Sequence, residues 1–226
     1  MRTGMKRTMV VAWAITLLMS MAVPLSAGAQ DRRGPRRMGG FGGPTWWVSA
    51  WGGYQWSDQV GDPGTKSTWD FDSNWSVRFT AEREVAPRTT IGAVFNYARL
   101  PLGIFGSASS ASCRPRCGAE ATTVQYGLMA RSGGGRGFHL VYEGFVGALR
   151  YSNFTVVPAG ATEYDGLTNT DFAYSFGTGI GYGLSRDFEL AAMFDYGSSM
   201  HEKSNDLFQR RTTRHYTTRL GLRVGL

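Results

Sequence analysis

Apolar and polar residues alternate with a period of two along most of the chain after residue 45. In the segment 68–82, for example, Trp69 and Phe71 alternate with Asp70 and Asp72. Because successive side chains of a strand point to opposite faces, this pattern predicts a strand with one apolar and one polar face. The eight predicted strands are 46–57, 68–82, 89–100, 121–131, 138–151, 171–184, 188–196 and 216–226.

The connections between these strands alternate in length. Long polar loops are expected at 58–67, 101–120, 152–170 and 197–211, and tight turns at 84–88, 132–137 and 185–187. Short turns on one side and long loops on the other are typical of an up-and-down antiparallel barrel. A sandwich with crossing connections does not produce this rhythm.

Alternation alone fits two classes: a transmembrane barrel with its apolar face outside, and a soluble lipocalin-like ligand-binding barrel with that face inside. The second face of 172–184 consists of four glycines, an alanine and a serine, which suits a crowded barrel interior better than a surface in water. We therefore predict an all-β, eight-stranded antiparallel transmembrane β-barrel over residues 45–226. Aromatic residues near the strand ends are expected to form two interfacial girdles, namely Trp46, Trp47, Tyr54, Trp56, Trp69, Phe71 and Tyr97.

The N-terminus has the features of a cleaved signal peptide over residues 1–29. A basic start is followed by the apolar run 9–23 and by Ala27-Gly28-Ala29, a small-residue cleavage pattern. Residues 30–44, with four arginines, five glycines and two prolines, are predicted to form a flexible basic tail. The formal charge of +7 falls to +4 without residues 1–29, and the tail contributes +3 of that. The predicted barrel is therefore nearly neutral, and nucleic acid is not an expected partner.

A cleavable signal, eight amphipathic strands, short turns, long loops and a last apolar-alternating strand resemble the small outer-membrane β-barrel family of OmpA/OmpX type. The resemblance implies a monomer in the outer membrane of a diderm bacterium, surrounded by lipid, with the tail in the periplasm. It also implies recognition of the last strand by the barrel assembly machinery, although the final residue is Leu226 where the family usually has an aromatic one. The implied role is structural, or an interaction with a surface ligand or host cell through the four long loops.

The inward face of the predicted barrel carries charges of both signs. Charges enclosed in a narrow lumen need partners, so we expect ion pairs that plug the bore. A narrow gated ion pore is the alternative. The predicted lumen network consists of Asp70, Asp72, Arg78, Glu82, Glu143, Glu189, Asp195, Arg219 and Arg223.

Few other residues suggest chemistry. Cys113 and Cys117 are expected to form a disulfide in an oxidising compartment. His215 and Thr217 share one strand face, which raises the alternative of a lipid A-modifying, deacylase-like enzyme, but a serine and an acidic partner are missing there. His201 is expected to be an ordinary loop residue. We predict no catalytic residues, no cofactor and no metal site.

Overall fold

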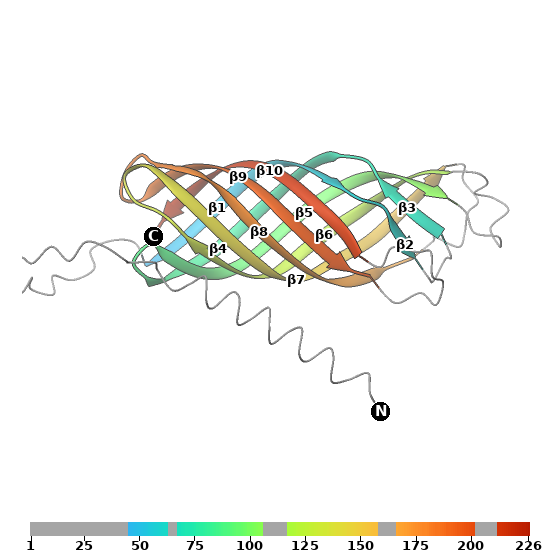
Figure 1. The fold of residues 1–226 in the computed structure, drawn as a ribbon, viewed down its shortest axis with the longest axis horizontal. Helices are drawn as coiled ribbons and strands as arrows, with labels where there is room; N and C mark the ends of the chain where they lie inside the picture. The colour runs from blue at the N-terminus through green and yellow to red at the C-terminus, as the bar shows by residue number, and fades with distance from the viewer. Residues whose placement is uncertain (1–44, 63–66, 106–116, 158–165, 202–211) are drawn as a thin grey trace, which may run out of the picture.

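The computed structural model describes residues 45–62, 67–105, 117–157, 166–201 and 212–226. Within them, eight long strands form the wall of a barrel and two short strands form an extension (Figure 1). The signal peptide and the tail predicted for 1–44 lie outside the described residues. The strands are β1 (Trp46–Ser57), β2 (Val60–Asp62), β3 (Ser67–Phe71), β4 (Asn74–Ala86), β5 (Thr89–Phe105), β6 (Cys117–Ser132), β7 (Gly137–Val157), β8 (Asn169–Gly183), β9 (Phe188–Met200) and β10 (Thr212–Gly225).

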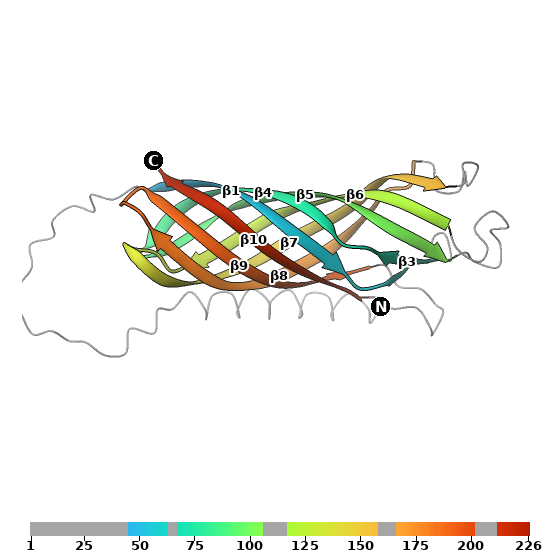
Figure 2. The same cartoon turned by 90° about the horizontal axis from the view of Figure 1, so that it is seen from above.

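Each long strand pairs antiparallel with its neighbours in chain order, and β1 pairs with β10 to close the cylinder. The pairing of β1 with β10 runs from Trp47 opposite Gly225 to Ser57 opposite His215. Figures 1 and 2 show the tight turns and the C-terminus at one end, here called the turn end. The opposite end, which holds β2 and β3, is called the loop end.

The side chains of the wall alternate between an exposed apolar exterior and a buried interior. On β4, Trp75, Val77 and Phe79 are exposed, while Ser76 and Arg78 between them are buried. This arrangement confirms the predicted closed eight-stranded antiparallel barrel. In the described part of the chain no helix is long and apolar enough to cross a membrane.

The single strand predicted at 68–82 is wrong, because the chain breaks at Asp72 and Ser73 and reverses its phase there. Odd-numbered residues of β3 are buried, whereas even-numbered residues of β4 are buried. Trp69 and Phe71 therefore point into the barrel and are 0% and 5% exposed, and they do not belong to an interfacial girdle. Asp70 is only partly buried and Asp72 is exposed, so neither joins the lumen network.

The break between β3 and β4 is held by hydrogen bonds to β5. The Asp72 backbone amide donates to the Pro101 carbonyl at 2.8 Å, and the Asn74 side chain donates to the Arg99 carbonyl at 2.7 Å. The N–H and the C=O of a strand residue point toward the same neighbouring strand. Because the Pro101 carbonyl points toward the break, the N–H that proline lacks would point there too, where no regular strand pairing needs it. Pro101 can therefore lie within β5.

Several strands extend further toward the loop end than predicted. β5 runs to Phe105, β6 begins at Cys117 and β7 runs to Val157, so parts of the predicted loops 101–120 and 152–170 belong to the wall. β3 pairs with the outer part of β5, with Phe71 opposite Leu102. The barrel is consequently taller on this side, and inward side chains of β3, such as Trp69 and Phe71, fill its additional interior.

Candidate functional site in the barrel interior

A continuous network of ion pairs crosses the bore between the turn end and the middle of the barrel. Arg223 of β10 donates through Nη2 to Glu82 Oε2 at 2.8 Å and lies 3.5 Å through Nη1 from Glu189 Oε2. Glu189 in turn accepts from Arg131 of β6, which also lies 3.9 Å from Glu143. These contacts join five residues from five strands into one chain of alternating charge.

The network continues from Glu143 of β7. Glu143 accepts from Arg78 of β4 and, at 2.8 Å, from Arg219 of β10. Arg219 also holds Asp195 of β9 through Nε at 2.6 Å and through Nη2 at 3.0 Å, a bidentate pair. Seven of the nine residues predicted for the lumen network therefore come together. Arg131 is the eighth member and links Glu189 to Glu143.

The network is both buried and balanced. Its eight members are at most 6% exposed, and they comprise four arginines and four carboxylates. Around Glu82, the hydroxyls of Thr80 and Thr90 donate at 2.7 and 2.6 Å and satisfy further lone pairs. Buried charges are tolerated when they are paired and hydrogen-bonded in this way, whereas removal of one partner is costly.

Aromatic rings and glycines fit around the charges. The Trp51 ring lies 4.4 Å from Arg219 Cζ and 5.3 Å from Arg131 Cζ, within cation–π distance. Gly221 lies opposite Trp51 on β10, and a Cβ there would come within 2.2 Å of the indole ring. A Cβ at Gly177 would come within 2.1 Å of Asp195. These bare positions therefore provide the room that the network occupies.

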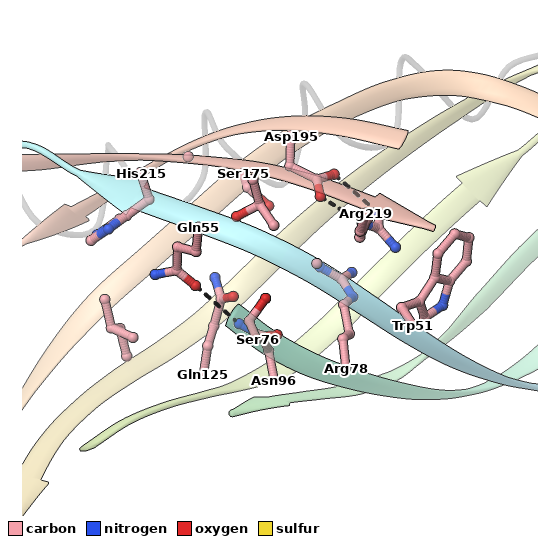
Figure 3. Close-up of a pocket in the computed structure, with 14 residues that line it drawn as sticks. Trp51, Gln55, Ser76, Arg78, Asn96, Gln125, Ser175, Asp195, His215 and Arg219 are labelled. Atoms are coloured by element: carbon pink, nitrogen blue, oxygen red, sulfur yellow. Dashed lines mark hydrogen bonds and ion pairs between the residues drawn. The ribbon is translucent and has the colours of Figure 1, made fainter. Parts of the chain in front are cut away.

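A small polar cavity lies on the loop-end side of the network (Figure 3). Its volume of about 30 Å³ is enough for one or two water molecules. Two guanidinium atoms at its edge, Arg78 Nε and Arg219 Nη1, have no partner among the described residues. Trp51, Leu149, Asp195 and two glycines also line it. The other lining residues are polar, namely Gln55, Ser76, Asn96, Gln125, Ser175, His215 and Thr217.

Above the cavity, an apolar plug fills the loop end. Trp69 of the hairpin packs against Phe154 with ring centroids 4.9 Å apart, and against Tyr151 at 5.9 Å. Phe71 stacks on Tyr151 at 5.6 Å. The plug closes the loop end with apolar residues. The prediction that polar and charged side chains alone fill the lumen is therefore wrong at this end. It continues along the inner faces of β5 to β7 through Val94, Leu100, Leu102, Ile104, Met129, Phe145 and Leu149.

The plug is tied to the wall by His201, which sequence analysis placed in an ordinary loop. Its Nδ1 lies 2.9 Å from both carboxylate oxygens of Asp171, and its Nε2 lies 3.1 Å from Asp62 Oδ1. Burial opposes the charge of His201, but the hydrogen bonds and charges of Asp171 and Asp62 outweigh it and raise its pKa to about 9. His201 is therefore a cation at neutral pH that connects the β2–β3 hairpin to β8. It is far in sequence from both carboxylates, so local spacing carried no signal of this site.

His215 and Thr217 line the interior cavity and do not face the membrane side of the wall. His215 Nε2 lies 2.9 Å from Ser199 Oγ, and its Nδ1 lies 2.7 Å from Ser57 Oγ. Ser199 is fully buried. A serine thus does lie beside His215, on the neighbouring strand, but in a place that a lipid acyl chain in the surrounding membrane does not reach.

The remaining predicted aromatic residues lie in three kinds of position. Trp46, Tyr54 and Tyr97 are exposed on the outer wall. Trp56 is half-buried and stacks on Tyr216 at 5.8 Å. Trp47 faces inward, where its ring lies 4.1 Å from Arg223 Cζ.

The predicted disulfide stays a prediction. Cys113 lies outside the described residues, and Cys117, the first residue of β6, is buried.

No family model matches the sequence, and no curated protein matches it. Among solved structures, surface protein A (NspA) of Neisseria is similar with a TM-score of 0.55 at 14% identity, covering 82% of this chain and 99% of that one. The N-terminal β-barrel domain of OprF from Pseudomonas aeruginosa has a TM-score of 0.46 at 8% identity, with 81% and 99% covered. The outer membrane protein OprG of the same organism has a TM-score of 0.43 at 12% identity, with 81% and 97% covered.

The closed barrel and its likeness to NspA define the class of the fold. It is the fold of the small eight-stranded outer-membrane β-barrels. In this protein the bore is closed twice, by the ion-pair network and by the apolar plug.

Proposed function

We propose that the chain is an outer-membrane β-barrel with a structural or surface-interaction role, and that solutes do not pass through it. The closed lumen is the observation that supports this role. Eight buried charges in mutual contact and an apolar plug on Trp69 leave a cavity of only about 30 Å³ between them. The alternating wall places exposed apolar side chains on the outside, as lipid requires.

In this proposal the loop end faces the cell exterior and the turn end faces the periplasm. The residues between β9 and β10 include Lys203, Arg210 and Arg211, which are trypsin sites. Trypsin added to intact cells is expected to cut there and to spare the arginines of 30–44. Cleavage of the tail alone would show the opposite orientation.

Planar-bilayer recording tests the closed lumen. The purified barrel, checked for folding by its heat-modifiable gel mobility, is expected to give no steady conductance steps. Steady large steps that persist in repeated insertions would contradict the proposal and favour a pore.

A further inference from the structure

A second, larger cavity lies at the turn end, and the proposed structural or surface-interaction role does not use it. It has a volume of about 550 Å³, within the range of small-molecule sites. Its walls come from all three tight turns and from the turn-end parts of β1 and β10. We call it the turn-end vestibule, and its lining includes Trp47, Arg88, Arg136, Arg186, Glu189 and Arg223.

Three arginines of the vestibule are exposed, and each comes from a different turn: Arg88, Arg136 and Arg186. None of them forms an ion pair within the described residues. Two carboxylates also line the cavity, but Glu189 is engaged by Arg131 and Arg223, and Glu84 accepts the Arg88 backbone N–H at 3.3 Å. The vestibule therefore holds an excess of positive charge on groups that are free to bind a ligand.

A glycine turn keeps the cavity open. Gly133, Gly134 and Gly135 have φ values of 114°, 154° and 129°, which side chains rarely permit. A Cβ at Gly134 would lie 4.0 Å from Glu189 Oε2, and one at Gly135 would lie 3.9 Å from the Arg88 guanidinium. The turn thus lies beside both Glu189 of the network and the Arg88 guanidinium, and it adds no side chain to the space between its neighbours.

We infer that the turn-end vestibule binds the phosphate group of an anionic ligand. Guanidinium forks match the oxygens of phosphate, and three unpaired forks favour a dianion over a single carboxylate. Trp47, packed on Arg223, provides an apolar wall beside the charges. The segment before β1 is not the occupant, because its four arginines would be repelled by the vestibule.

Calorimetric titration of inorganic phosphate, pyrophosphate and acetate into the folded protein, in an uncharged detergent at low ionic strength, tests this inference. Pyrophosphate is expected to bind saturably and more tightly than acetate. The double variant Arg136→Gln, Arg186→Gln should bind pyrophosphate at least tenfold more weakly. The matched control is Arg150→Gln, Arg214→Gln, which removes the same charge from exposed arginines near the loop end and should change affinity less than twofold.

If both double variants bind pyrophosphate equally weakly, the attraction is a general one to a cationic protein and the inference is overturned. Acetate binding as tight as that of pyrophosphate, or the lack of saturable pyrophosphate binding, would also overturn it. Heat-modifiable mobility confirms that each variant is folded. Short-chain phosphatidylglycerol added to the micelles then separates two sources of phosphate. Competition with pyrophosphate supports a lipid headgroup as the ligand, and lack of competition supports a soluble phosphate compound.

Discussion

Arg223 and Glu82 are 141 positions apart in the sequence, and their side chains meet at 2.8 Å in the barrel interior. One belongs to the last strand and the other to β4, the second strand of the wall. β1 lies between them, so the pair forms only when the first and last strands have met. The contact therefore reports closure of the cylinder.

Substitution of Glu82 is expected to destabilise the barrel strongly. Glu82→Gln leaves Arg223 with the more distant Glu189 as its one charged partner and gives the buried network an excess positive charge, which should lower the free energy of unfolding by about 3 kcal/mol. The control is Glu120→Gln, which breaks the exposed Arg99–Glu120 pair (2.9 Å) and should cost at most about 1 kcal/mol. Urea unfolding in one detergent measures both, and equal losses would contradict a special role for the network.

Gly221 is expected to tolerate no side chain. Gly221→Ala places a methyl group against the Trp51 ring and should destabilise the barrel by about 1–3 kcal/mol through overpacking. Gly52 is next to Trp51 but on the outer face, and a Cβ there would have no atom within 4 Å, so Gly52→Ala should be neutral. Urea unfolding of the two alanine variants compares the inner and outer faces of the same sheet region.

The His201 contacts predict a pH dependence near the loop end. The folded-state pKa of about 9 exceeds the ordinary value of 6.5, so protonation stabilises the fold. This stabilisation is complete below about pH 6.5 and is lost as the pH rises through 9, with a slope of up to about 1.4 kcal/mol per pH unit. The difference in unfolding free energy between the wild type and His201→Gln, measured from pH 6 to 10, should shrink with rising pH. A constant difference would show that His201 does not titrate in this range.

The phase reversal at residues 72–73 predicts different surroundings for two nearby tryptophans. Trp75 is 71% exposed on the outer wall, whereas Trp69 is fully buried in the plug. Brominated lipids should quench the fluorescence of Trp75 and spare that of Trp69. The part of the total fluorescence that these lipids quench should therefore become smaller in Trp75→Phe and stay the same in Trp69→Phe. Trp69→Ala should also cost about 3–5 kcal/mol, because it leaves a cavity in the plug.

The two cysteines are expected to be oxidised. Alkylation of the denatured, unreduced protein should modify neither Cys113 nor Cys117, and alkylation after reduction should modify both. Mass spectrometry counts the added groups. Modification without reduction would show that the thiols are free.

Much of the wall could be predicted because each strand has its own period-two pattern. The predicted bounds 46–57 are those of β1, and charges on one parity, such as Arg219 and Arg223, do face the lumen together. Strand β7 was harder to interpret, since it is apolar on both parities. Leu140 and Val146 face outward, whereas Val141 and Phe145 are buried, and no pattern within the strand shows that the interior beside it is apolar.

The errors at Trp69, Asp70, Phe71 and Asp72 share one cause. The alternation of apolar and polar residues continues through Asp72 and Ser73, although the strand itself breaks there. The reversal of the inward and outward faces depends on hydrogen bonds to Arg99 and Pro101 of β5. The triad of Asp62, Asp171 and His201 is likewise assembled from three elements, by the hairpin that this break allows. Both features arise from tertiary contacts, which a pattern along one strand does not contain.

The plug and the vestibule make the two ends of the molecule unequal. With Trp69 and its neighbours sealing one mouth and a cavity of about 550 Å³ at the other, the protein has the shape of a cup. In the proposed closed barrel, water and small ions inside the cup would exchange with one compartment only. A ligand of the vestibule would then come from that compartment while the barrier between the two sides of the membrane stays intact.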